Sequence, residues 1–222
     1  MITLHHLNNS RSQRILWLLE ELELDYQIKS YQRDAKTDLA PPELKKIHPL
    51  GKAPILTDGD LTFAESGAIL EYLAERYGAE KWVPKTGSPA FYQYRYWLHA
   101  AEGSLMPLLV MKLIFNKVKS SPMPFFVKPV ARGIADKVGS AYLDPNLKTQ
   151  FDYIEQHLSQ NPWFAGDAIS AADVQMSFPL EAAQDRQGFS QQHAHIKRWL
   201  ERVHARPAYQ RALQKGGDYA YA

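Results

Sequence analysis

Apolar residues in the first part of the chain switch between strand and helix spacing. Residues 2–7 form a short apolar run typical of a buried strand, and residues 8–10, Asn-Asn-Ser, predict the turn that ends it. Residues 15–22 carry apolar side chains at helical spacing with glutamates on the opposite face. Residues 26–31 alternate as a strand does. A strand, a helix and a strand within about thirty residues predict a βαβ unit with parallel strands.

A second set of elements follows a polar connection. Residues 55–56 and 61–63 predict two strands joined by a tight turn at Asp58-Gly59, a dipeptide that favours hairpins. Helical spacing begins after residue 65, and Ser66 is in a position to cap the free backbone donors of that helix. The pattern therefore predicts a β-α-β, linker, β-β-α domain over residues 1–78.

The rest of the chain predicts helices. Residues 79–89 are rich in glycine and proline and indicate a linker between two cores. From residue 90 onward we expect an all-helical domain, 90–222, that starts with a long aromatic-rich helix bent near Pro107. Further helices are expected over 127–142, 146–158 and 196–203, the last one stopping at Arg206-Pro207 before a short tail.

Composition narrows the functional classes. The 222 residues include 26 lysines and arginines against 24 aspartates and glutamates, so no strong field favours nucleic acid or a membrane surface. The start of the chain does not resemble a secretion signal, and we expect no later segment to span a bilayer, which favours the cytoplasm. Cysteine is absent, which excludes disulfides and protein-thiol chemistry, and the scattered histidines predict no metal site.

Pro54 lies at the mouth of a predicted strand, where it removes a backbone donor. A cis bond between Ala53 and Pro54 would let Ala53 offer its N–H and C=O to an extended peptide, and Lys52 would add a positive charge. An ordinary edge proline beside a solvated lysine is the other interpretation.

Two linked segments resemble the glutathione site of the glutathione transferase superfamily. They are Pro49-Leu50-Gly51-Lys52-Ala53-Pro54-Ile55-Leu56 and Glu65-Ser66-Gly67-Ala68-Ile69. A third match is Ser170-Ala171-Ala172-Asp173, a capping box that begins a buried helix in the second domain of this family and serves folding. The resemblance implies a thioredoxin-like domain followed by an all-helical domain, and a homodimer.

The resemblance also implies a set of glutathione-binding residues. Pro54 is the cis proline, and Ala53 pairs its backbone with the cysteinyl unit of glutathione. Glu65 and Ser66 hold the γ-glutamyl end, and Lys52 lies near the glycyl carboxylate. A tripeptide with one ammonium and two carboxylates needs such a mixture of an anionic partner, cationic or helix-end partners and a strand-like edge.

The loop after the first strand is where this family places the group that stabilises the glutathione thiolate. A hydrogen-bond donor aimed at sulfur favours the thiolate over the thiol. Ser10 is the first candidate because its hydroxyl can point at the sulfur, although a plain helix cap is an alternative role. Asn9 is the second candidate, since it aligns with the serine of the serine-using classes. Some members of the family with asparagine or threonine in this loop act on disulfides of glutathione.

The acceptor substrate is expected between the domains, against the long helix. Tyr94, Trp97 and Glu102 are the candidate pocket residues, although an aromatic stripe is more often core. The aromatic content suggests an apolar electrophile. The loop and residues 97–107 look closest to a bacterial and fungal group with Asn-Ser-Arg in this loop.

The leading hypothesis is a glutathione transferase with glutathione as co-substrate, no metal and no nucleic-acid or membrane partner. Reduction of a peroxide or disulfide with glutathione is an alternative within the same fold. A non-catalytic, transferase-like binding module is the rival from another class, because a fold does not fix a function. Retention of Lys52, Pro54, Glu65 and Ser66 together argues against that rival.

Overall fold

A four-stranded mixed sheet forms the N-terminal domain of the computed structural model, which describes residues 1–37, 39–185 and 192–221. The strand order is β2-β1-β3-β4. The strands are β1 (Ile2–Leu7), β2 (Tyr26–Tyr31), β3 (Ile55–Asp58) and β4 (Leu61–Ala64). β1 and β2 are parallel and β3 and β4 form an antiparallel hairpin, which confirms the predicted βαβ-ββα order.

The hairpin turn is one residue further along than predicted. Asp58 pairs with Leu61, so the two residues between the strands are Gly59 and Asp60, not Asp58 and Gly59. Gly59 has a φ of 59°, a left-handed conformation that glycine adopts without steric cost.

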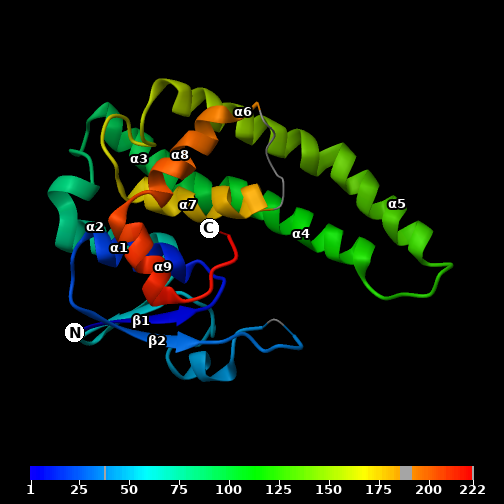
Figure 1. Cartoon of the computed structure of the whole chain (residues 1–222), viewed down its shortest axis with the longest axis horizontal. Helices are drawn as coiled ribbons and strands as arrows, with labels where there is room; N and C mark the ends of the chain where they lie inside the picture. Colours follow the sequence, from blue (N-terminus) through cyan, green and yellow to red (C-terminus); the bar gives the residue numbers. More distant parts are fainter. Residues whose placement is uncertain (38, 186–191, 222) are drawn as a thin grey trace.

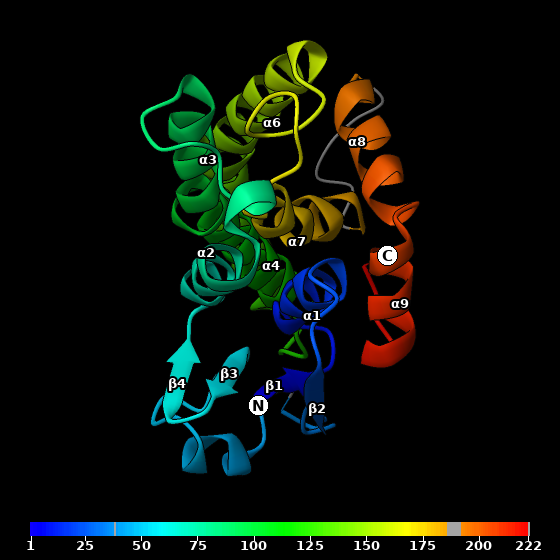
Figure 2. The same cartoon turned by 90° about the vertical axis from the view of Figure 1, so that its left-hand side faces the viewer.

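Two helices cover one face of the sheet, as Figure 2 shows. They are α1 (Ser12–Glu21) and α2 (Ser66–Trp82), and the 3₁₀ turn η1 (Pro42–Lys46) lies on the other face. α2 begins at Ser66 itself, and no side chain caps this end of the helix, so the expectation that Ser66 caps it is wrong. Ser66 thus retains its hydroxyl for other partners at a helix N-terminus.

Helices account for the ordered secondary structure described after β4. They are α3 (Pro89–Ala100), α4 (Met106–Ser120), α5 (Lys128–Val138), α6 (Asp144–Gln160), α7 (Ala171–Asp185), α8 (Ala194–His204) and α9 (Pro207–Gly216). α2 continues past a kink at Gly78 to Trp82, so only residues 83–88 separate it from α3. The break between the two helices is therefore shorter than the predicted linker.

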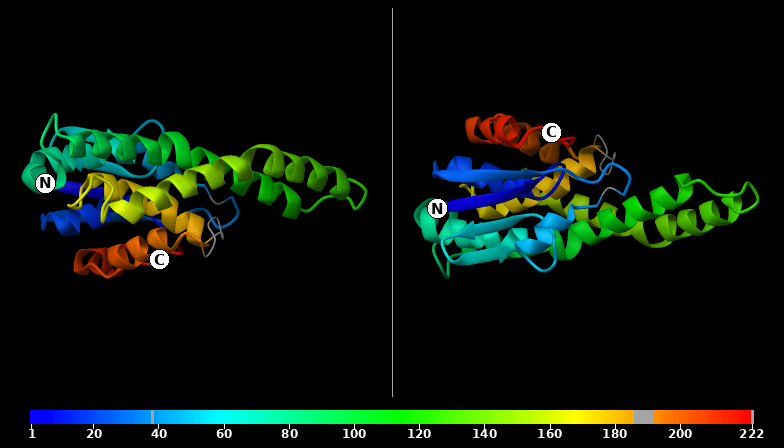
Figure 3. Two further views of the ribbon diagram at one scale, coloured as in Figure 1. Left: turned by 90° about the horizontal axis from the view of Figure 1, so that it is seen from above. Right: turned by 90° about the horizontal axis from the view of Figure 1, so that it is seen from below.

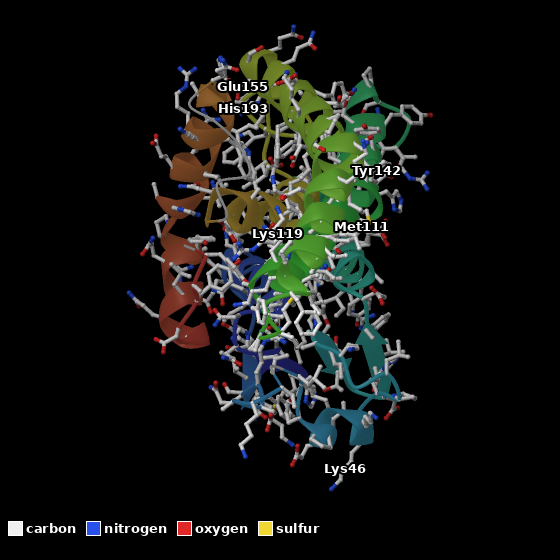
Figure 4. All side chains as sticks on the ribbon, turned by 90° about the vertical axis from the view of Figure 1, so that its right-hand side faces the viewer. Lys46, Met111, Lys119, Tyr142, Glu155 and His193 are labelled. Carbon is white, nitrogen blue, oxygen red and sulfur yellow. The ribbon has the colours of Figure 1, made fainter. Side chains whose placement is uncertain are left out.

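Two π-helical turns shape the long helices. Ala101–Leu105 joins α3 to α4, so the irregular turn lies before Pro107, near which the sequence predicted a bend. Gly139–Leu143 joins α5 to α6, so the two helices predicted over 127–142 and 146–158 follow each other without a loop. Figures 1 and 3 show α4 and α5 extending together beyond the rest of the molecule. Figure 4 looks nearly along α4 and labels Met111 and Lys119 on it, and Tyr142 on the π-helical turn after α5.

The segment Pro89–Ser120 is long and apolar enough, by length and composition alone, to cross a membrane. This contradicts the expectation that no later segment has that length. The segment carries buried core residues such as Trp97 and Leu98, and a core helix of a soluble protein meets the same criterion.

Charged side chains fix the start of α8. The Glu155 carboxylate accepts hydrogen bonds from the His195 and Ile196 backbone N–H groups at 2.9 and 3.0 Å. His193 contacts Asp152 at 3.3 Å, and Figure 4 shows His193 next to Glu155. A carboxylate at a helix N-terminus is favoured by the helix dipole.

The residues after Arg206 form helix α9, where the sequence predicted only a short tail. Tyr209 of α9 is 1% exposed and its ring meets Trp17 of α1 edge to face at 5.5 Å. Arg211 adds an ion pair with Glu20 at 2.8 Å. α9 therefore covers the outer side of α1, and it ties the end of the chain to the N-terminal domain.

One apolar core extends through both domains, so the expectation of two separate cores is wrong. The same cluster contains Leu4 and Leu56 of the sheet, Leu70 of α2 and Trp199 of α8. α7 passes through its centre, between the N-terminal domain and the outer helices (Figure 2). A shared core holds the two domains in a fixed relation, and it fixes the walls of the space between them.

Candidate functional site

A cavity of about 840 Å³ lies between the sheet domain and helices α4 and α7. Its lining includes every residue that the sequence predicted for glutathione or thiol contact. These are Asn9, Ser10, Lys52, Ala53, Pro54, Glu65 and Ser66, together with the acceptor candidate Glu102. Residues that are up to 93 positions apart in the sequence thus meet at one site.

The polar wall of the cavity is built by the ends of β1, β3 and β4. The Ala53–Pro54 bond is cis, as predicted. β1 and β3 pair antiparallel with His5 opposite Ile55, so the loop after β1 lies beside Ala53 and Pro54. Glu65 has a φ of 71° and is exposed, whereas Ser66 is 3% exposed at the start of α2. A carboxylate, a hydroxyl and free helix N–H groups therefore face the same space.

The Ser10 hydroxyl is engaged in the turn that starts α1. It donates to the Leu7 carbonyl at 2.7 Å, lies 2.8 Å from Ser12 Oγ, and accepts from the Ser12 N–H at 3.2 Å. Ser12 Oγ in turn contacts His6 Nδ1 at 2.9 Å. Ser10 is only 6% exposed, so its single proton is used inside the turn.

In the same loop, the Asn9 side chain makes fewer hydrogen bonds within the described residues than the Ser10 hydroxyl does. Its φ is 49°, and its Oδ1 accepts the Ala220 N–H at 2.8 Å. The Asn9 carbonyl accepts from Arg33 at 3.3 Å, and Arg33 also donates to Asn8 through its backbone N–H at 3.0 Å. Within the described residues, no hydrogen bond involves Asn9 Nδ2. The contacts of Asn8 and Asn9 thus hold the loop in place, and Asn9 lines the cavity.

A buried charge network forms the base of the cavity. Glu102 accepts from Arg11 Nε and from Arg14 Nη2, both at 2.9 Å. Arg14 is fully buried and also donates to Gln175 Oε1 at 2.5 Å. Both guanidinium groups lie over the Phe178 ring, at 5.5 and 5.2 Å. Burial raises the pKa of the Glu102 carboxyl, but the charges of Arg14 and Arg11 outweigh it and hold that pKa below its usual range.

The opposite wall of the cavity is apolar. It is formed by Met106, Val110 and Leu113 of α4 and by Phe178 of α7. Tyr94 and Trp97, which the sequence placed in the acceptor pocket, do not line it. They are 2% and 1% exposed.

Trp97 is packed inside the helical domain. Its ring lies 4.8 Å from the rings of His157 and Phe164 and stacks on Tyr153 at 5.4 Å. The aromatic stripe on α3 therefore belongs to the core, and the cavity begins one turn later, at Glu102.

Several lining residues were missed by sequence reasoning. Arg33, Phe178, Ala220 and Tyr221 come from a loop, a buried helix and the end of the chain. The spacing of apolar residues along the chain does not predict contacts between residues so far apart in sequence. In residues 1–37, 39–185 and 192–221, no group of three or more His, Cys, Asp or Glu side chains is placed to hold a metal.

Comparison with known proteins identifies the family of this chain. The glutathione S-transferase N-terminal domain model matches residues 1–75, and the C-terminal domain model matches residues 107–207. Glutathione S-transferase 3 of Schizosaccharomyces pombe is 40% identical, over 98% of this chain and 89% of that protein. The crystal structure of a glutathione S-transferase from Actinobacillus pleuropneumoniae has a TM-score of 0.81 at 35% identity, covering 99% of this chain and 94% of that one.

A mixed sheet with a cis proline just before β3, followed by a helical domain packed over it, defines a thioredoxin-like domain joined to an all-helical one. Together with these matches, this arrangement shows that the chain belongs to the glutathione S-transferase family. A more distant relative carries another activity in its name: the disulfide-bond oxidoreductase YfcG of Escherichia coli is 29% identical, over 97% of this chain and 95% of that protein.

Proposed function

We propose that this glutathione transferase joins the thiolate of glutathione to small apolar electrophiles in the cavity between the domains. The observation that carries the proposal is the pairing of two unlike walls in one cavity. One wall presents the peptide edge at Ala53 with Glu65 and Ser66, and the other presents Met106, Val110 and Phe178. A polar wall suits a charged tripeptide, and an apolar wall suits the group that receives its sulfur.

In this proposal, glutathione lies along the end of β3. Its cysteinyl backbone pairs with Ala53, and its γ-glutamyl group meets the Glu65 carboxylate and the start of α2 at Ser66. The helix N-terminus favours the γ-glutamyl carboxylate, and the Glu65 carboxylate favours the ammonium group. Lys52 is exposed beside this edge and suits the glycyl carboxylate. The sulfur then lies next to the loop after β1.

We assign the thiol-stabilising donor to Asn9 Nδ2. The sequence favoured the Ser10 hydroxyl, but that hydroxyl already donates within its own turn, at 2.7 Å to Leu7 or 2.8 Å to Ser12. Asn9 lines the cavity, and its Nδ2 has two N–H groups. A donor aimed at sulfur lowers the pKa of the bound thiol, because it stabilises the thiolate more than the thiol.

Two alanine variants test this assignment. Asn9→Ala is expected to lower kcat by about ten- to a hundredfold and to raise the pKa of the bound thiol, with little change in glutathione affinity. Ser10→Ala is expected to change stability more than the thiol pKa, because its hydroxyl holds the turn. The ultraviolet absorbance of the thiolate, followed against pH, reports that pKa. A raised thiol pKa in Ser10→Ala alone would transfer the role to Ser10.

Disulfide reduction is the second candidate function. It is favoured by the relationship to the Escherichia coli disulfide-bond oxidoreductase and by an asparagine in the loop of a chain without cysteine. In that reaction a glutathione thiolate attacks one sulfur of a disulfide and the other sulfur leaves as a thiolate. Turnover of a mixed disulfide that exceeds turnover of aryl halides would support this function over conjugation.

If the chain is instead a non-catalytic binding module, we expect neither reaction and no binding of glutathione at millimolar concentration.

A homodimer and a cytoplasmic location are expected from the family, and they remain predictions for this chain. Sedimentation of the purified protein tests the first of them.

A further inference from the structure

The chain after α9 returns toward the cavity, and Figure 1 shows it turning back toward α7. It is anchored there by two aromatic side chains. The Tyr219 hydroxyl donates to Glu181 Oε2 at 2.5 Å, and the Tyr221 ring meets Phe178 edge to face at 5.5 Å. Glu181 is 1% exposed. The segment from Gly216 to Tyr221, the C-terminal segment, is therefore held in a defined place.

This segment contacts the loop after β1 directly. The Ala220 N–H donates to Asn9 Oδ1 at 2.8 Å, across 211 residues of sequence. A backbone N–H can only donate, so it must face the oxygen of the Asn9 carboxamide and not its nitrogen. With the oxygen occupied, the amide nitrogen is the end that remains for a ligand. Asn9, Ala220 and Tyr221 all line the cavity.

A second contact joins this segment to β1, just before the loop. His6 Nε2 lies 3.1 Å from the Gly216 carbonyl, which can only accept, so this nitrogen carries the proton. His6 Nδ1 then accepts from Ser12 Oγ, which lies 2.8 Å from Ser10 Oγ. A Cβ at Gly216 would lie 2.6 Å from Gln13 Oε1, so glycine permits this close approach.

We propose that the C-terminal segment is a positioning element for the thiol-stabilising loop, and that the Ala220 N–H orients the Asn9 carboxamide toward the sulfur of glutathione. The inference rests on the proposed role of Asn9. Ala220 itself touches no reacting atom in this account. It acts by fixing which end of Asn9 faces the cavity, so its loss should lower turnover without weakening the binding of glutathione through Glu65 and Ser66.

Ala220→Pro tests the proposal, because proline removes the N–H that Asn9 accepts; its ring also fixes φ and restricts the preceding residue, so a second proline variant is needed as control. The control is Asp218→Pro, which puts the same ring into the same segment. No hydrogen bond of the Asp218 N–H is found in the described part of the chain. Ala220→Pro is expected to lower kcat about three- to tenfold, the range for one lost hydrogen bond, and to raise the pKa of the bound thiol. The KM for glutathione should stay close to the wild-type value.

A double variant separates this inference from the assignment of Asn9. If Ala220 acts through Asn9, then Asn9→Ala with Ala220→Pro should turn over no more slowly than Asn9→Ala alone. Equal kcat and thiol pKa in Ala220→Pro and Asp218→Pro, with a clear loss in Asn9→Ala, would overturn the positioning role and leave the assignment of Asn9 standing. No effect of Asn9→Ala would overturn both. Thermal midpoints of all variants show whether each is folded.

Discussion

Removing the carboxylate of Glu102 is expected to destabilise the protein, because it leaves a buried guanidinium without its counter-charge. Arg14 is fully buried, and Glu102 is its only carboxylate partner among the described residues. Its Nε already lacks a hydrogen-bond partner there. Breaking a buried ion pair typically costs about 3–5 kcal/mol, since one charge remains uncompensated in the interior.

Two features of the site reduce that cost. The Glu102 side chain is 31% exposed, so water partly screens the pair, and Gln175 still accepts from Arg14 at 2.5 Å. Arg11 is 34% exposed and is solvated when it loses its partner. We therefore expect Glu102→Ala to lower the free energy of unfolding by about 2–3 kcal/mol. Glu102→Gln retains an oxygen for Arg14 and should lose about half as much.

Urea unfolding followed by tryptophan fluorescence measures these changes. For a chain of this size, each kcal/mol moves the thermal midpoint by about 2–4 °C. Lys148→Ala is the control, because it removes an exposed ion pair with Asp152 and should leave the urea midpoint almost unchanged. If Glu102→Ala unfolds at the same urea concentration as Lys148→Ala, the buried network does not stabilise the interface between the domains.

Two further predictions concern pH. The folded-state pKa of Glu102 is held below its ordinary value of 4.5, so its stabilising contribution is complete above that value and is lost as pH falls through the folded-state pKa. The stability difference between the wild type and Glu102→Gln should therefore shrink in acid. The contribution of Asp173 to stability changes with pH in the opposite direction. Burial raises the pKa of its carboxyl from 3.8 to about 6, although four hydrogen bonds favour the charged form. Relative to Asp173→Asn, the wild type should gain stability as pH falls from about 7 to 5, and a constant difference in urea midpoints would contradict this.

Elements with a local signal could be predicted from the sequence. Strand alternation and the hairpin dipeptide predicted the order of the strands. The segment around Pro54 predicted most of the residues in the polar wall of the cavity. One half of the capping box is confirmed, because the Asp173 carboxylate accepts the Ser170 N–H at 2.9 Å; the Ser170 hydroxyl donates to that carboxylate at 3.1 Å, while the Asp173 N–H goes to the Ser170 carbonyl at 3.0 Å. Asp173 also accepts from Phe164 and Trp199, and those partners have no sequence signature.

α9 was missed for a specific physical reason. Pro207 was interpreted as the end of a helix, but proline is also favoured in the first turn of a helix, where its missing N–H is not needed. α9 also has few apolar residues, since it packs on α1 partly through charged pairs such as Arg211 with Glu20.

The apolar wall of the cavity could not be predicted from the sequence, because tertiary packing decides which apolar residues line it. Tyr94 and Trp97 share the helical spacing that a pocket-lining stripe would have. Only the tertiary structure shows that they are core: Trp97 packs against α6 and the loop after it, and Tyr94 is 2% exposed. The contacts of Arg14 with Glu102 and of Ala220 with Asn9 join residues far apart in sequence. No periodic pattern predicts them.

The most direct test of the glutathione site is a calorimetric titration of wild type, Ser66→Ala and Ser159→Ala with reduced and oxidised glutathione. Ser159 is exposed on α6 and serves as the control. We expect the wild type and Ser159→Ala to bind alike, and Ser66→Ala to bind about tenfold more weakly because it loses a hydrogen bond to a charged group. Preference for the oxidised form would favour disulfide chemistry. Absence of binding to either form at millimolar concentration would contradict the enzyme function, and only the assignment of the fold would stand.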